Sequence, residues 1–237
     1  MSAYNCLANY YNRFTQEDAD YSKWVQFVLT QLPPSAQRGV DLACGTGKMT
    51  RLLAANRLDV VGMDSSQDML AQATAQGGKC RYVCQRLQDF STPSKVDFVT
   101  IVNDGVNYLQ PNELPRLFQR VHSCLKTGAK LIFDISSYYK LSQVVGNNVF
   151  FVDDDDVTCL WSNTFDTDKV QMDLTFFVKQ GDLYQRFDEM HVQYAHQTQQ
   201  VVQLLSQIGF DVVTYDCYTT NPITTTTQRV TFVATKH

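Results

Sequence analysis

The chain has 237 residues, of which 44% are hydrophobic and 19% are charged, and its formal net charge is −4. This composition fits a globular protein with one large domain, or with one domain and a small addition. The acidic balance disfavours nucleic acid as the main partner, because phosphate binding needs clustered lysines and arginines. No stretch approaches the roughly 18 apolar residues of a membrane span, and the first residues lack the basic and apolar regions of a signal peptide. We therefore expect a cytoplasmic protein without a membrane partner.

The first half of the chain predicts alternating helices and strands. Apolar residues follow helical spacing up to about residue 31, where Pro33 and Pro34 stop the pattern. Strands joined by helices then indicate a parallel sheet with right-handed crossovers, which is an α/β fold. The predicted strands cover 39–43, 59–64, 81–86, 96–103 and 129–136, and the predicted helices cover 48–55, 66–75 and 111–125, with Gly128 ending the last helix.

The second half begins with a different pattern. Between about 148 and 194 the apolar residues recur with period two, most clearly from Val170 to Val178. This period predicts an antiparallel meander with hairpins in place of helical crossovers. A helix at 199–208 follows, and Gly209 ends it. The last two predicted strands are joined by a Thr-rich loop too short for a helical crossover, so they should pair antiparallel.

The cysteines and acidic residues suggest no metal site and no disulfide framework. Seven cysteines form an odd set without paired spacing, and no Cys/His cluster has the spacing of zinc ligands. The four consecutive acids at 153–156 are interpreted as a solvated hairpin turn, because ion-binding loops space their ligands. The thiols that lie in or beside apolar segments, and are therefore expected to be buried, are Cys44, Cys80, Cys84, Cys124 and Cys159.

The stretch "VDLACGTGKMT" predicts a ligand-binding turn between the first strand and the next helix. Gly45 and Gly47 let the backbone approach a ligand beside a helix N-terminus. A nucleoside triphosphate loop would need glycine and Ser or Thr where Leu42 and Met49 stand. A dinucleotide turn would need a third glycine at the position of Thr50, which weakens the nicotinamide and flavin alternatives without removing them. S-adenosylmethionine has no pyrophosphate, so it does not need that glycine.

Asp64 strengthens this interpretation. It ends the second predicted strand, 17 residues after Gly47, where an acid can accept hydrogen bonds from both hydroxyls of a ribose. The alternative is an acid that only favours the start of the next helix. The glycine turn and the strand-terminal acid together predict a nucleoside site.

These motifs resemble those of class I S-adenosylmethionine-dependent methyltransferases. "VDLACGTGKMT" resembles their first motif, "VVGMDSSQDMLAQA" the second and "VDFVTIVNDGVNYL" the fourth. "DYSKW" and "HVQYAHQTQQVVQLLSQIGF" resemble the YqeM-like group of bacterial small-molecule methyltransferases. The resemblance implies a Rossmann-like, doubly wound, seven-stranded and mostly parallel sheet with its last strand antiparallel. Residues 1–139 and 196–237 would form the cofactor-binding domain with an N-terminal helical cap, and 140–195 an inserted antiparallel β lid over the substrate.

The resemblance also implies roles for the residues around the glycine turn. Gly45 and Gly47 would line the methionine and ribose part of S-adenosylmethionine. Asp41 would support the loop and the amino end of the cofactor, and Asp64 would accept from the ribose hydroxyls. Tyr11 would reach the carboxylate region from the N-terminal helix.

Two further cofactor contacts are implied at the ends of the third and fourth strands. Asn103 would approach the methionine part, and the backbone N–H of Leu87 would meet the adenine ring. The family usually has an Asp before Leu87 that accepts from the adenine amino group, but Arg86 stands there and can only donate. Gln85, Gln88 or Asp89 would replace that contact, or it would be missing.

The predicted reaction is an in-line methyl transfer to a small-molecule acceptor. The protein mainly aligns the acceptor and excludes water, and a base is needed only where the acceptor must lose a proton. His191 matches a family His near the end of the meander, with a surface His as the alternative, and Asp104 would face the transferred methyl group. The runner-up functions are a NAD-dependent oxidoreductase and a non-catalytic S-adenosylmethionine-binding regulator. A monomer or homodimer is expected.

Overall fold

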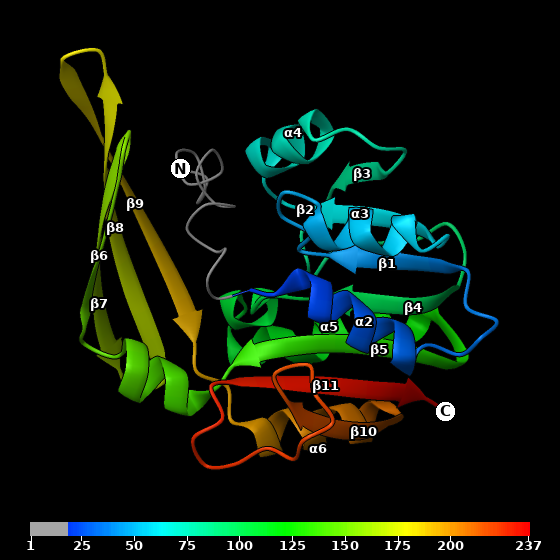
Figure 1. The fold of residues 1–237 in the computed structure, drawn as a ribbon. Helices are drawn as coiled ribbons and strands as arrows, with labels where there is room; N and C mark the ends of the chain where they lie inside the picture. The colour runs from blue at the N-terminus through cyan, green and yellow to red at the C-terminus, as the bar shows by residue number, and fades with distance from the viewer. Residues whose placement is uncertain (1–18) are drawn as a thin grey trace.

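The computed structural model describes residues 19–237, which form two separate β-sheets. Seven strands make the main sheet, in the order β10-β11-β5-β4-β1-β2-β3, and four strands make a second sheet, in the order β6-β7-β8-β9. We call the second one the small sheet. It stands to one side of the main sheet in Figure 1 and is joined to it before β6 and after β9.

The main sheet confirms the predicted topology. Strands β3, β2, β1, β4 and β5 run parallel in that spatial order, and β11 is antiparallel to both β5 and β10. The sheet is therefore doubly wound and mostly parallel, with its last strand antiparallel. Its strands are β1 (Arg38–Leu42), β2 (Asp59–Asp64), β3 (Arg81–Cys84), β4 (Val96–Ile101), β5 (Leu125–Ser136), β10 (Phe210–Asp216) and β11 (Arg229–Lys236).

Helices cover both faces of this sheet. One buried cluster joins apolar residues of α5 and α6 to the sheet, and a second joins α2 and α3 to the opposite face. Alternation along β5 shows why, because Leu131 and Phe133 belong to the first cluster and Ile132 to the second. The helices are α2 (Tyr21–Gln31), α3 (Lys48–Ala55), α4 (Gln67–Ala75), α5 (Leu114–Cys124) and α6 (Thr198–Ile208). No described helix has both the length and the hydropathy that crossing a membrane requires.

Some predicted boundaries and burials were wrong. Helix α5 ends at Cys124 because Leu125 is already extended (φ −80°, ψ 146°), so Gly128 lies inside β5 and does not end the helix. Strand β4 ends before Asn103 because that residue is left-handed (φ 60°). Cys84 is exposed, since β3 is an edge strand, and Cys80 and Cys124 are partly exposed. All six cysteines in the described part are free thiols.

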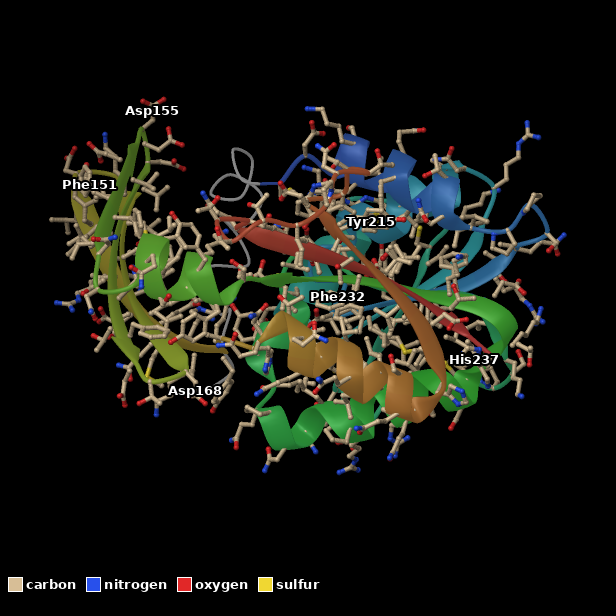
Figure 2. The ribbon with its side chains drawn as sticks, turned by 90° about the horizontal axis from the view of Figure 1, so that it is seen from below. Phe151, Asp155, Asp168, Tyr215, Phe232 and His237 are labelled. Carbon is tan, nitrogen blue, oxygen red and sulfur yellow. The ribbon has the colours of Figure 1, made fainter. Side chains whose placement is uncertain are left out.

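The small sheet is the predicted antiparallel meander. It contains β6 (Val149–Asp154), β7 (Val157–Asp166), β8 (Lys169–Gln180) and β9 (Leu183–Tyr194), and the π-helix η3 (Lys140–Val145) precedes it. Its apolar inner face and η3 share one buried cluster. Figure 2 shows Phe151 on the side of this sheet away from the main sheet, which carries Phe232. The acids at 153–156 lie at the exposed β6–β7 turn, and residues 19–237 contain no group of side chains arranged to hold a metal.

Candidate functional site

A cavity of about 430 Å³ opens at the carboxyl ends of β1, β2, β3 and β4. Its wall is formed by the segments that follow these four strands, together with Tyr21 of α2 and Met69 of α4. Open α/β sheets bind their ligands at this edge, and small-molecule sites have volumes of about 300 to 1,000 Å³. The cavity therefore has the place and size of a cofactor site.

The turn after β1 contains two glycines with different structural roles. Gly45 has φ +52° and lines the cavity, and a Cβ placed on it would meet no atom within 4 Å. Gly47 has φ +71° and lies just before α3, but a Cβ there would collide with the Tyr82 ring. Gly45 thus leaves ligand space open, whereas Gly47 allows close packing of α3 against β3 and lies outside the cavity wall.

Asp64 ends β2 in the cavity wall. Its Oδ2 accepts from the Gly45 N–H at 2.8 Å, and its Oδ1 accepts from the Ser66 N–H at 2.9 Å. Burial raises the pKa of this carboxyl above its usual value. A carboxylate has about four acceptor positions, so these two bonds orient Asp64 and leave positions for ligand hydroxyls.

Asp41 lies beneath the turn and is fully buried. It accepts hydrogen bonds from the Thr50 hydroxyl at 2.6 Å and the Thr100 hydroxyl at 2.8 Å. Burial raises its pKa to about 6. Asp41 therefore ties the start of α3 to β4 and does not line the cavity. This role of Thr50 was not predicted from the sequence, although its position, where a dinucleotide turn would have a third glycine, was a signal.

After β3, Arg86 lines the cavity, and 68% of its side chain is exposed. Its guanidinium donates to Asp89 Oδ2 at 2.5 Å and 3.0 Å, and Arg116 also pairs with Asp89 at 2.5 Å. Of the three residues expected to replace the missing acid, Gln88 lines the cavity beside Leu87. Its Nε2 donates to Glu113 Oε1 at 3.1 Å, which fixes the amide and leaves its oxygen as an acceptor.

Gln85 and Asp89, the other two expected replacements, are used elsewhere. Gln85 Oε1 accepts from the Ser91 N–H at 2.9 Å, and Asp89 carries the two arginine contacts. Neither of them lines the cavity.

The loop after β4 carries two consecutive left-handed residues. Asn103 (φ 60°) lines the cavity, whereas Asp104 (φ 55°) does not. The Asp104 carboxylate accepts from Gln193 Nε2 at 2.5 Å and from Arg229 Nη1 at 3.1 Å. Arg229 is buried, also pairs with the buried Asp134, and lies over the Trp24 ring at 5.0 Å. Asp104 is thus part of an ion network, which sequence reasoning missed because its members are far apart in the chain.

The same loop is bonded to the base of the small sheet. Asn107 is fully buried, and its Nδ2 donates to the carbonyl oxygens of Ser136 and Tyr194 at 3.0 Å and 2.9 Å. His196 Nε2 lies 3.3 Å from the Val106 carbonyl oxygen, and burial lowers the pKa of that imidazole. A single loop therefore forms one wall of the cavity and holds the end of β9.

His191 lies on β9 and is only 3% exposed, so the alternative of a surface His is wrong. Its ring meets the Tyr108 ring edge-on, with centroids 6.1 Å apart, and its Nε2 lies 3.4 Å from Glu189 Oε2. Tyr108 lines the cavity. His191 is therefore separated from the cavity by one aromatic ring.

The predicted site residues thus fall into three groups. The cavity wall brings together Gly45, Asp64, Leu87 and Asn103. The supporting structure outside this wall contains Asp41, Gly47 and Asp104, and His191 lies on the small sheet. The predicted contact of Tyr11 lies outside the described residues.

Comparison with known proteins gives one consistent family. A family model described as a methyltransferase domain matches residues 40–128. A protein of Geobacillus sp. (strain WCH70) is 33% identical over 98% of this chain and 99% of its own. YqeM of Bacillus subtilis (strain 168) is 31% identical over 92% of each chain, and both proteins are named provisionally as methyltransferases.

A solved structure is similar to this chain over nearly its whole length. An S-adenosylmethionine-dependent methyltransferase from Clostridium acetobutylicum ATCC 824 matches with a TM-score of 0.89 and 36% identity, covering 98% of both chains. Its fold is therefore shared by this chain. The chain belongs to the S-adenosylmethionine-dependent methyltransferases.

Proposed function

We propose that this methyltransferase binds S-adenosylmethionine in the cavity at the carboxyl edge of the main sheet and methylates a small molecule. The observation that carries the proposal is Asp64, which ends β2 in the cavity wall and is oriented by the Gly45 N–H. A carboxylate held at this place can accept from both ribose hydroxyls.

The other residues of the cavity wall fit the same cofactor. The open space beside Gly45 admits a ligand close to the backbone. We assign the Leu87 N–H to the adenine ring and the Gln88 Oε1 to the adenine amino group, where the family acid is absent. Asn103 is assigned to the methionine part. Asp41 and Gly47 act indirectly, because they hold α3 and the turn in place.

S-adenosylmethionine supplies a methyl group on a positively charged sulfur. An in-line nucleophile can attack the methyl carbon and displace the sulfur. The chain's own task is to align that nucleophile and to exclude water. We propose that the small sheet does so as a lid, since its strand β9 is bonded to the loop that carries Asn103.

Two predicted catalytic residues receive different roles. His191 is assigned to accept a proton from the acceptor, since it is buried beside Tyr108 at the cavity. Asp104 is assigned as a positioning residue, because Arg229 and Gln193 already hold its carboxylate. The cytoplasmic location and the monomeric or homodimeric state remain predictions.

The test is calorimetric titration of the whole protein with S-adenosylmethionine, S-adenosylhomocysteine and NAD. We expect binding of the first two, and Asp64→Ala should weaken it by about 2.7 kcal/mol, or a hundredfold, through two lost charge-assisted hydrogen bonds. The matched control is Asp68→Ala, an acid in the first turn of α4. Binding of NAD alone, or an unchanged affinity in folded Asp64→Ala, contradicts the proposal.

A further inference from the structure

A second cavity, of about 600 Å³, lies between α5 and the segment that leads into β4. We call it the basic groove. Its wall is formed by residues of 90–95 and by one side of α5 from Arg116 to Cys124, and it shares no lining residue with the proposed cofactor cavity. Lys95 and Cys124 directly precede the first residues of β4 and β5, so the groove reaches the amino ends of these strands. It is therefore a separate site, with a volume in the range of small-molecule sites.

The basic groove concentrates positive charge in a chain whose formal net charge is −4. Lys95, Arg116 and Arg120 line it, and none of the described residues in its wall is an acid. The positive charge also acts beyond the wall. Burial lowers the pKa values of His122 and Lys236, and the charge of Lys95 lowers both further. A concave surface lined by one sign of charge attracts ligands of the opposite sign, so the groove suits an anion.

The three cations keep donors for a ligand. Lys95 is exposed, and within residues 19–237 it has no hydrogen-bond or ion-pair partner. Arg120 is half-buried and donates to the Phe90 carbonyl oxygen at 3.1 Å, and no acid of the described part forms an ion pair with it. Arg116 pairs with Asp89, which lies outside the groove wall. A guanidinium has five N–H donors, so each of these arginines can still bind an anion.

Hydroxyl groups stand beside these cations. Those of Ser91 and Thr92 line the groove, and neither has a hydrogen-bond partner in the part of the chain that the structure describes. The Ser94 hydroxyl also lines the groove and accepts from Arg38 Nη1 at 3.3 Å, which leaves its own proton to donate. Guanidinium forks and side-chain hydroxyls are common partners of phosphate oxygens. The donor set therefore favours a phosphate group.

We propose that the basic groove binds a small molecule through a diphosphate group. Arg116 and Arg120 are four residues apart on α5 and therefore neighbours on the helix surface, where two guanidinium forks can contact adjacent phosphates. Lys95 supplies a third charge from the facing segment. A single phosphate carries about two negative charges at pH 7 and a diphosphate carries more, so three cations match the larger anion better.

A nucleic acid fits this groove less well than a small molecule does. Affinity for a nucleic acid grows with the number of phosphates that lysines and arginines neutralise, and three cations neutralise few. The inference goes beyond the proposed function and does not depend on it, because the groove and the proposed cofactor cavity have separate walls.

The test is calorimetric titration of the full chain, without divalent cations, with pyrophosphate, inorganic phosphate, malonate and a short single-stranded oligonucleotide. Pyrophosphate should bind at least tenfold more tightly than phosphate or malonate, and added salt should weaken its binding. Lys95→Gln and Arg116→Gln should each weaken pyrophosphate binding fivefold or more. Both altered side chains are exposed, so we expect both variants to fold. The matched control is Lys79→Gln, an exposed lysine outside the groove, which should change the affinity less than twofold.

Competition with S-adenosylhomocysteine separates this site from the proposed cofactor cavity. Saturating S-adenosylhomocysteine should leave the affinity for pyrophosphate within threefold, and its displacement of pyrophosphate would overturn the proposal. The proposal is also overturned if pyrophosphate does not bind, if phosphate or malonate binds as tightly, if the oligonucleotide binds more tightly, or if Lys95→Gln and Arg116→Gln both bind pyrophosphate like the wild type. Failure of S-adenosylhomocysteine itself to bind would instead count against the proposed function, and the two variants would still decide the inference.

Discussion

The carboxyl edge of the main sheet and the inner face of the small sheet are built in different ways. At the main-sheet edge, short turns determine the site through backbone conformation, as at Gly45 and Asn103 with their positive φ values. On the small sheet, side chains from β7, β8 and β9 meet only because the strands pair in a given register. The first kind of arrangement is local in sequence. The second depends on how all the strands of the small sheet pair.

The ion network around Arg229 connects the two regions, so its removal should destabilise both. Arg229→Met leaves Asp134 buried without its cation, so we expect the free energy of unfolding to fall by about 3 to 5 kcal/mol. Urea unfolding measures this loss. Arg186→Met, which removes an exposed ion pair with Asp188, should change the stability little. Equal effects of the two substitutions would contradict the structural role of the network.

The pH dependence of the free energy of unfolding should distinguish the buried acid beneath the main-sheet edge from an exposed acid on the small sheet. Burial raises the pKa of Asp41 to about 6, so the folded state holds its proton in a range where the unfolded chain has lost it. The contribution of Asp41 to the free energy of unfolding therefore falls by roughly 2 to 3 kcal/mol as the pH rises from about 4 to 6.

The variant that isolates this effect is Asp41→Asn, which cannot ionise. We expect the unfolding free energy of Asp41→Asn, measured relative to the wild type by urea titration, to rise from pH 4 to pH 7. Asp173→Asn, on the small sheet, serves as the matched exposed control. A constant difference across this range would show that Asp41 titrates normally.

The bond between Gln193 and Asp104 tests whether the two regions work together. Gln193→Leu should leave the dissociation constant of S-adenosylmethionine within twofold, because Asp104 is outside the cavity wall. It should raise the activation free energy by about 1 kcal/mol and so lower kcat roughly fivefold, because β9 loses a link to the loop that carries Asn103. Calorimetry measures the dissociation constant, and steady-state kinetics with the acceptor measures kcat. Gln185→Leu removes an exposed bond on the same strand and should change neither; a kcat effect of equal size there would argue against coupling.

The smallest effect is expected at the proposed adenine end of the cavity. Gln88→Leu removes the proposed acceptor for the adenine amino group and should weaken S-adenosylmethionine binding by about 1 kcal/mol, or fivefold. Gln85→Leu is the matched control, since its amide oxygen is bonded to the Ser91 N–H away from the cavity. Calorimetry that finds the larger loss at Gln85 would move the adenine contact to that residue.

The main-sheet edge could be predicted from the sequence because its signals are short and local. The glycine turn, the strand-terminal Asp64 and the change of period near residue 148 identified a turn and an acid that line the cavity, and the two sheets. The ends of α5 and β4 were misplaced because a single residue, Leu125 or Asn103, leaves the regular conformation there. No local pattern marks such a departure.

The side chains that meet through tertiary structure could not be predicted in the same way. Arg229 reaches Asp104 across 125 residues of sequence, and Gln193 reaches it across 89. His191 was identified only through a family resemblance, because a two-residue period cannot say which face a polar residue occupies when a strand carries polar residues on both faces. Strand register, which depends on the whole sheet, decides these contacts.

The proposed cofactor site depends on the turns at the main-sheet edge. Amide hydrogen exchange of the full chain, with and without saturating S-adenosylhomocysteine, tests it most directly. Protection should rise in the turns at 43–46, 64–66, 86–88 and 102–109. Protection in the strands of the small sheet, apart from the end of β9, should change little. Protection that rises only in the small sheet, or that leaves these four turns unchanged, would contradict the account.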